Sequence, residues 1–217
     1  MILLFVGPKG SGKDTQTQLL ESSGFANIST GSLFRQEMQD NTELGMKSKQ
    51  YYDAGKLVPD ELVLEILKKH ISKAEADDIV LNGVVRTLEQ IKPTEEMLAS
   101  IEKKIDKVIY FNLSDEEAVK RLANRWTCPV CNTVYHTLFD PPKVAGVCDK
   151  DGAALLQRAD DKPDAVKMRL SEDRTKTGPV VDHYREIGIL HEIDGSKSIE
   201  EVASELHELI KVFKEQQ

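Results

Sequence analysis

The segment with the clearest chemistry lies near the N-terminus and reads Gly7-Pro8-Lys9-Gly10-Ser11-Gly12-Lys13-Asp14-Thr15. Glycines allow the backbone to curl until successive N–H groups point at one anion, and a helix that begins there adds partial positive charge. The ammonium group of Lys13 would reach out to the terminal phosphates. The pattern predicts a loop that binds nucleotide phosphate through Gly10, Ser11, Gly12, Lys13, Asp14 and Thr15.

The sequence around this loop supports the interpretation. The run Ile2–Val6 is continuously apolar and predicts a buried strand, while a helical pattern opens at Gln16. Strand, glycine-rich turn and helix form the context that a phosphate loop requires. One residue departs from the strict motif, because Asp14 follows the lysine where Ser or Thr is expected, and the hydroxyl comes at Thr15. The plainer alternative is a strand-to-helix turn without a ligand.

A second group of residues has the spacing of metal ligands. Cys128 and Cys131 are separated by two residues, and Cys148 and Asp151 repeat that spacing further along. Three thiolates and a carboxylate suit tetrahedral zinc, and a full set of protein ligands marks a structural ion. Such an ion would fix a segment with too few apolar residues to fold alone; the plainer alternative is three free thiols. Two further residues compete for the fourth position: His136 and Asp149.

The composition excludes several classes of protein. The chain has 217 residues, of which 40% are hydrophobic, enough for a sizeable core. A net charge of −8 argues against a main role in gripping nucleic acid. No apolar run approaches the length of a membrane span, and no stretch resembles a cleavable signal. Because the three cysteines are clustered and no export signal is present, they predict a metal site rather than disulfides. Together these features predict a cytoplasmic protein without membrane or nucleic-acid partners.

The elements that position these groups alternate along the chain. Short apolar runs predict strands at 2–6, 25–29, 79–81, 108–111 and 189–193. Amphipathic patterns predict helices near 60–72, 87–101, 115–124, 161–186 and 198–214. This alternation is typical of an α/β fold, here a doubly wound five-stranded parallel sheet with helices on both faces.

Two segments interrupt the alternation. Residues 30–58 are helical without an intervening strand, and residues 125–160 are rich in Cys, Pro, Gly and Asp and lack helical periodicity. Both are predicted to be insertions at the edge of the sheet where open α/β sheets bind ligands. The core domain is then discontinuous and comprises residues 1–29, 59–124 and 161–217.

Five motifs in order resemble those of the adenylate kinase family, from Ile2 to about Val212. Besides the phosphate loop, they are Ile28–Arg35, Gly55–Asp60, Gly83–Thr87 with Gln90, and the segment Cys128–Asp161. The resemblance implies a P-loop kinase with a helical NMP-binding insertion and a long zinc-bearing lid. It also implies reversible phosphoryl transfer from ATP to AMP, giving two ADP, by a monomer that uses Mg²⁺ carried with ATP.

The resemblance assigns five arginines to phosphate groups. It implies that Arg35 and Arg86 hold the phosphate of AMP, that Arg125 contacts the triphosphate, and that Arg158 and Arg169 bridge the transferred group from the AMP side. Guanidinium groups suit this work because they stay charged and grip phosphate in a planar fork. Any one of them alone could equally be a surface ion pair. The implied catalytic set is Lys13, Arg86, Arg125, Arg158 and Arg169.

The same resemblance implies how the two bases are held. For AMP it points to Thr30 and Gln90, since a Gln side chain can donate to and accept from one base edge. For ATP it points to the backbone near Lys197 and to Val134 and Tyr135 in the lid. The rest of the implied AMP site is the backbone of Lys56, Leu57 and Val58 and the loop residues Gly83, Val84 and Val85.

Two positions depart from the family pattern. The family usually has Gly after the loop lysine and Asp at the end of the third strand, where this chain has Asp14 and Asn82. One hypothesis is an exchange in which Asp14 takes over the anchoring of the magnesium water shell. Alternatively, Asp14 caps the start of a helix, where an acid is favoured, or it repels phosphate and slows the enzyme.

Three other functions are open at this point. The first is the same chemistry on UMP or CMP, and the second is a nucleotide-binding protein with impaired turnover, motivated by Asp14 and Asn82. The third is a zinc-knuckle protein that binds nucleic acid, which the acidic residues around the cysteines disfavour.

The remaining charged residues receive simpler interpretations. Asp160 and Asp161 are expected at the return of the lid, where they orient arginines. Residues interpreted as surface, helix or structural charges are Arg121, Arg174, Arg185, His70, His183 and His191.

Overall fold

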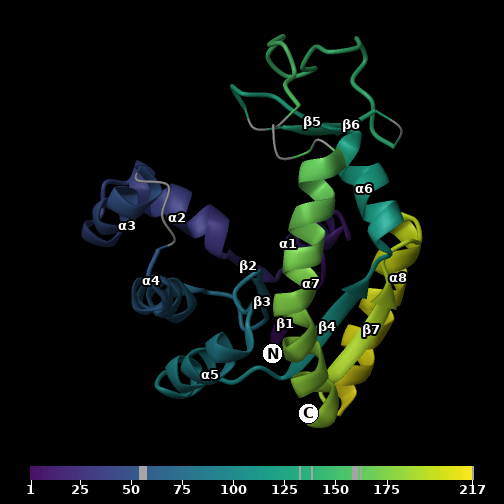
Figure 1. The fold of residues 1–217 in the computed structure, drawn as a ribbon. Coiled ribbons are helices and arrows are strands. Elements are labelled where there is room, and N and C mark those ends of the chain that lie inside the picture. Colours follow the sequence, from purple (N-terminus) through teal and green to yellow (C-terminus); the bar gives the residue numbers. More distant parts are fainter. Residues whose placement is uncertain (54–57, 132, 138, 158–160, 162, 217) are drawn as a thin grey trace.

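Five parallel strands form the centre of the computed structural model, which describes residues 1–53, 58–131, 133–137, 139–157, 161 and 163–216 (Figure 1). Their order in the sheet is β2-β3-β1-β4-β7. Each strand begins and ends within one residue of its predicted range, so the doubly wound five-stranded sheet is confirmed. The strands are β1 (Ile2–Val6), β2 (Ala26–Ser29), β3 (Ile79–Asn82), β4 (Lys107–Asn112) and β7 (Leu190–Asp194).

Helices cover both faces of this sheet, as predicted. One face is covered by α4 (Asp60–Lys73), α5 (Ile91–Ala99) and α7 (Pro163–Glu186). The other face is covered by α1 (Lys13–Ser22) and α8 (Ile199–Glu215). The predicted helix over 87–101 is divided, because a short 3-10 turn, η1 (Leu88–Gln90), precedes α5.

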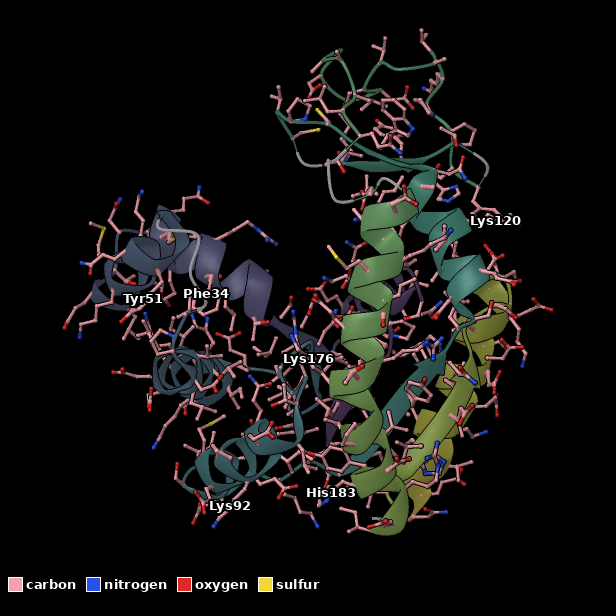
Figure 2. All side chains as sticks on the ribbon, viewed as in Figure 1. Phe34, Tyr51, Lys92, Lys120, Lys176 and His183 are labelled. Atoms are coloured by element: carbon pink, nitrogen blue, oxygen red, sulfur yellow. The ribbon has the colours of Figure 1, made fainter. Side chains whose placement is uncertain are left out.

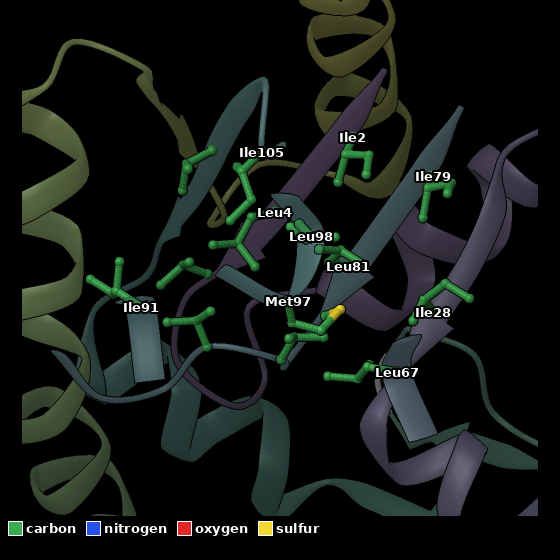
Figure 3. Packing of buried hydrophobic residues seen from close by; sticks show 14 of the residues in the cluster. Ile2, Leu4, Ile28, Leu67, Ile79, Leu81, Ile91, Met97, Leu98 and Ile105 are labelled. Atoms are coloured by element: carbon green, nitrogen blue, oxygen red, sulfur yellow. The ribbon is translucent and has the colours of Figure 1, made fainter. Parts of the chain in front are cut away.

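The central strand β1 is buried on both sides. Leu4 belongs to the same buried cluster as Leu81, Leu67 and Leu98, and Figure 3 labels these four side chains, which come from two strands and two helices. Phe5 faces the opposite layer and meets Phe111 edge to face at 4.9 Å. Because both faces are covered, the strand is a continuous apolar run instead of an alternating one.

Local capping signals fix where several helices begin. Before α8, the Ser198 hydroxyl accepts from the Glu201 N–H while the Glu201 carboxylate accepts from the Ser198 N–H, a reciprocal capping box. Before α6 (Asp115–Ala123), the Ser114 hydroxyl accepts from the N–H of Glu117. These caps start each helix immediately after a strand and so keep the connections short.

The first insertion consists of two helices, α2 (Thr30–Gln39) and α3 (Glu43–Asp53), which project away from the sheet in Figure 1. A buried carboxylate ties it to α4. Glu37 is 2% exposed and accepts from Lys69 Nζ at 2.7 and 2.9 Å, while His70 Nε2 lies 2.5 Å away. The Thr42 hydroxyl donates to the same carboxylate. These partners lower the pKa of Glu37 to about 2 against the opposing effect of burial.

The second insertion rises beyond the ends of α6 and α7 (Figure 1). It contains an antiparallel pair, β5 (Arg125–Thr127) and β6 (Val134–His136), and no helix among its described residues. This agrees with the predicted lack of helical periodicity. Over the whole described chain, no helix combines the length and apolarity needed to cross a bilayer.

Tyr184 in α7 provides a test of the packing. Its side chain is fully buried, and its hydroxyl has no hydrogen-bond partner in the described structure. Because an unpaired buried hydroxyl costs about 1–3 kcal/mol, Tyr184→Phe is expected to leave the free energy of unfolding in urea unchanged or raised. The matched control is Tyr135→Phe, whose hydroxyl accepts from Asp149 N at 2.8 Å and whose loss should destabilise. A clear loss of stability in Tyr184→Phe would contradict this account.

Candidate active site

The predicted phosphate loop connects β1 to α1, and steric constraints explain why two of its positions are glycine. At Gly7 a Cβ atom would lie 2.6 Å from the carbonyl oxygen of Phe111, so no larger residue fits where the loop passes β4. Gly12 has a φ of 88°, in the region that favours glycine, and nothing lies within 4 Å of its Cβ position. Gly12 therefore stands where a positive φ is needed, with open space beside it at the start of α1.

Lys13 lies across this loop. Its Nζ donates to the carbonyls of Gly7 at 2.6 Å and Pro8 at 2.8 Å and to the hydroxyl of Ser11 at 3.3 Å. Burial lowers the pKa of Lys13 to about 8, and the negative charge of Asp14 acts in the opposite direction. Three acceptors in the loop therefore hold the Lys13 ammonium, and burial makes that group easier to deprotonate.

Asp14 and Asn82 meet beside the loop. Asn82 ends β3, is 5% exposed, and donates from Nδ2 to Asp14 Oδ1 at 2.7 Å. The two positions that depart from the family pattern are therefore in direct contact.

Arg121 also belongs to this region: it lies on α6 and pairs with Glu117 one turn away, as expected of a helix charge, but it has distant partners as well. Only 17% of its side chain is exposed. It donates to the carbonyls of Gly195 at 2.7 Å and Ser196 at 3.2 Å, and reaches that of Gly10 at 3.4 Å. It thereby fastens the phosphate loop to the loop after β7. Sequence reasoning missed it because these partners lie 74 to 111 residues away and are backbone atoms.

The loop after β3 collects several residues predicted for AMP. Thr30 Oγ1 and Arg86 Nε both donate to the carbonyl of Gly83, each at 3.1 Å. Gln90 Oε1 accepts from the Arg86 N–H at 2.9 Å, while its Nε2 donates to Asp60 Oδ1 at 2.9 Å. Because a carboxylate only accepts, Asp60 fixes which end of the Gln90 amide is the donor.

A small pocket lies beside Gln90. Its wall is apolar, and two polar residues, Gln90 and Asp60, lie among those that line it. An apolar slot with a few placed polar groups is the usual form of a site for a flat base. The other lining residues are Val63, Leu64, Leu67, Val84, Pro93 and Thr94.

The remaining residues predicted for AMP are distributed as follows. Arg35 is exposed on α2, and Val85 is buried at 2% next to Arg86. Val58 is partly buried just before α4. Arg169 lies on α7, but its side chain is outside the described part. Three predicted residues lie outside the described residues altogether: Lys56, Leu57 and Arg158.

Arg125 stands at the root of the second insertion and forms a two-pronged ion pair. Its Nε donates to Asp161 Oδ2 at 2.9 Å and its Nη2 to Oδ1 at 2.6 Å. Asp161 is fully buried, and a quarter of the Arg125 side chain is exposed. The expectation that Asp161 orients an arginine is met at Arg125; Asp160 lies outside the described residues.

The residues predicted for the base of ATP differ in accessibility. Val134 is 52% exposed on the lid, whereas Tyr135 is 6% exposed and packs with Leu155 inside it. Lys197 is exposed, and its Nζ donates to Glu205 Oε2 at 2.7 Å. Tyr135 and Lys197 can therefore best offer a nucleotide their backbone, because their side chains are engaged elsewhere.

The four predicted metal ligands come together in the lid. The ligand atoms of Cys128, Cys131, Cys148 and Asp151 all lie within 4.8 Å of one another, and sulfur atoms are visible side by side there in Figure 2. The backbone N–H groups of Val130 and Cys131 point at Cys128 Sγ, at 3.4 and 3.5 Å. Donors aimed at sulfur favour the thiolate, so the group fits a zinc ion of the Cys3Asp type.

The two competing fourth ligands are engaged elsewhere. His136 Nδ1 accepts from the Phe139 N–H at 3.2 Å, so its Nε2 carries the proton donated to the Arg121 carbonyl at 3.0 Å. Asp149 Oδ1 accepts from the Lys143 N–H at 2.9 Å. Neither belongs to the group of four, so Asp151 is the carboxylate that completes it.

Together these features define a class of protein. A phosphate loop follows the central strand of a doubly wound sheet, a second loop follows its neighbour, and two insertions flank both. This is the arrangement of a P-loop nucleotide-binding phosphotransferase.

Comparisons with known proteins identify the family within that class. The adenylate kinase family profile matches residues 5–189. The adenylate kinase of Archaeoglobus fulgidus is 43% identical over 216 residues, which cover 99% of this chain and 100% of that protein. That of Listeria monocytogenes is 40% identical over 215 residues, covering 98% and 100%. The chain therefore belongs to the adenylate kinase family, and it is a nucleoside monophosphate kinase.

The pKa of Lys13 leads to a prediction for pH. The free protein loses the Lys13 proton above pH of about 8, whereas bound phosphate favours the ammonium, so ATP binding must take up a proton there. The Kd for ATP should rise above pH 8, approaching about tenfold per pH unit. Calorimetry at pH 9 in two buffers of different ionisation heat measures the uptake. Lys13→Met should bind weakly without this pH dependence, and a flat Kd up to pH 9.5 in the wild type contradicts the assignment.

Proposed function

We propose that this chain transfers a phosphoryl group reversibly from Mg·ATP to AMP, giving two ADP. The observation that carries the proposal is the pairing of β1 with β3, in register from Ile2 with Ile79 to Phe5 with Asn82. The phosphate loop and the Gly83 loop leave the same edge of the sheet from these neighbouring strands. Because parallel strands lie about 4.8 Å apart, the two loops can hold two phosphate chains end to end.

Transfer between two nucleotides needs little covalent help from the protein. It needs both substrates held in line, the charge of the moving group neutralised, and water kept out. The residues of this chain are proposed to act in those three ways only, and none is proposed as a nucleophile.

On the donor side, the amides of residues 10–15 and the ammonium of Lys13 hold the triphosphate. The proposal is supported by the open space at Gly12, beside the start of α1. Arg125 adds a guanidinium from the root of the lid, oriented by buried Asp161. The base of ATP lies between the backbone near Lys197 and the lid residues Val134 and Tyr135.

On the acceptor side, Arg35 and Arg86 hold the phosphate of AMP, and Thr30 and Gln90 read its base. The pocket beside Gln90 supports this assignment, because its apolar wall suits a purine face and Gln90 has both a donor and an acceptor. The loop Gly83–Val85 and the backbone of Lys56, Leu57 and Val58 complete the AMP site.

Arg158 and Arg169 are proposed to bridge the transferred group as the insertions close. In this division the core comprises residues 1–29, 59–124 and 161–217, the NMP-binding insertion 30–58, and the lid 125–160. The buried ion pairs Glu37–Lys69 and Arg125–Asp161 support the division, because each joins an insertion to the core.

Two metal ions belong to the proposal. When bound with ATP, Mg²⁺ neutralises part of the phosphate charge. It prefers oxygen ligands, held directly or through water, and this chain offers Asp14, the Thr15 hydroxyl and the Asn82 amide oxygen. Zn²⁺ is structural and is held by Cys128, Cys131, Cys148 and Asp151. The lid cluster Cys128, Tyr135, Cys148 and Leu155 is small, which supports a need for a metal to fix it.

We also propose that the chain works as a monomer in the cytoplasm. The compartment is supported by the state of the cysteines, which are all free of disulfides.

The acceptor assay tests the function directly. With Mg·ATP as donor, AMP should be phosphorylated with a kcat/KM at least about 100-fold above those of CMP, UMP and GMP, because a base without the matching edge leaves the remaining donor and acceptor positions of the Gln90 amide unpaired. Lys13→Met is the inactive control. A higher kcat/KM for UMP or CMP would show that the acceptor is that nucleotide and not AMP. Tight binding of two adenosines linked by a polyphosphate chain, without turnover, would indicate a binding protein instead.

Zinc binding has its own test. Elemental analysis should find about one zinc ion per chain, and Cys148→Ser or Asp151→Ala should lose it together with thermal stability. His136→Ala is the matched control, since it removes the competing ligand and should keep the metal. If zinc is retained in Asp151→Ala and lost in His136→Ala, the fourth ligand is His136 and not Asp151.

A further inference from the structure

We infer that Asp14 carries the carboxylate that anchors the water shell of the nucleotide-bound magnesium, and that Asn82 positions it. The inference rests on the proposed function, since the metal arrives with ATP. It concerns two neighbouring side chains that are in contact. The carboxylate stands on the helix after the loop, and an amide stands at the strand end where a carboxylate is usual.

Phosphate-loop enzymes commonly take their magnesium ligands from two places. One is the residue after the loop lysine, usually Ser or Thr, and the other is an Asp in the Walker B segment, which ends a strand of the sheet. In this chain the first place is Asp14, and the strand-end place on β3 holds Asn82, which pairs with Phe5 of β1. Relative to that arrangement, the carboxylate expected at the strand end is replaced by an amide, and a carboxylate stands instead at the start of α1.

The contact between the two side chains fixes their orientation. An ionised carboxylate only accepts, so the Asn82 amide presents Nδ2 to Asp14 Oδ1, at 2.7 Å. Asn82 is 5% exposed and held in the sheet, whereas Asp14 is exposed beside the loop. Within the described part of the chain, the second carboxylate oxygen of Asp14 accepts no hydrogen bond. One oxygen is therefore anchored and the other is free to accept from a metal-bound water.

The contact also separates this role from helix capping. Asp14 lies in the first turn of α1, where any acid gains from the helix dipole. Its hydrogen bond, however, is with the side chain of β3 and not with a backbone N–H of its own helix. A carboxylate beside a triphosphate is repulsive unless a cation lies between them. Asp14 should therefore oppose metal-free ATP and favour Mg·ATP, and this difference is measurable.

The experiment compares the affinity for the β,γ-imido analogue of ATP with and without Mg²⁺, by calorimetry and without AMP. The quantity is the ratio of the metal-free Kd to the Kd with Mg²⁺. Asp14→Asn should lower this ratio about tenfold, in the range reported for loss of an outer metal partner. The double variant Asp14→Asn with Asn82→Asp exchanges the two groups at nearly constant shape and should restore the ratio to within about threefold of wild type.

Each contrary result overturns the inference in a recognisable way. If Asp14→Asn lowers only the melting temperature, the residue is a helix cap. If it tightens both forms of the analogue equally, Asp14 only repels phosphate. If the double variant stays as low as the single one, the two positions are not exchanged. Glu21→Gln, an exposed acid on the same helix, controls for net charge and should leave the ratio unchanged.

Failure of the proposed function gives a different result. A wild type that binds Mg·ATP with a high ratio but does not phosphorylate AMP would refute the phosphoryl transfer and leave the metal inference standing. If the wild type phosphorylates AMP and Asp14→Asn keeps the wild-type ratio of the two Kd values, the metal inference is refuted and the phosphoryl transfer stands.

Discussion

The whole site depends on a loop whose backbone curls between the central strand and the first helix. The loop starts from β1, which pairs with β3 and β4 and is buried on both faces. Where the loop leaves β1, a Cβ atom at Gly7 would lie 2.6 Å from the carbonyl oxygen of Phe111 in β4. Glycine is needed at Gly7 because a side chain would collide with β4, and at Gly12 because the backbone has a positive φ.

Buried charge recurs where each insertion joins the core. Glu37 is held by Lys69, Thr42 and His70 at the first junction, and Asp161 by Arg125 at the second. A buried carboxylate is costly unless it is paired and hydrogen-bonded, and both are. Each pair links elements distant in sequence, so it fixes the direction in which an insertion leaves the sheet. The insertions can then carry their own ligands without disturbing the phosphate loop.

Much of the fold and part of the site could be predicted because their signals are local. Strand ranges follow from short apolar runs, the start of α8 from Ser198 and Glu201, and the cysteine group from equal spacing of its halves. Arg121 could not be predicted, since its partners are backbone carbonyls brought near only by folding. The choice of Asp151 over His136 and Asp149 likewise depends on where the lid turns direct each side chain.

The sequence by itself determined the class of sheet, because the periodicity of strands and helices is carried by neighbouring residues, and the motifs it shares with a known family indicated the family. Only the tertiary structure decided which distant groups meet: Arg121 with the loop carbonyls, Asp60 with Gln90, Asp161 with Arg125, and Asp14 with Asn82. These contacts join residues up to 111 positions apart in the chain. Such pairs are set by strand order and register, which no single stretch of the chain contains.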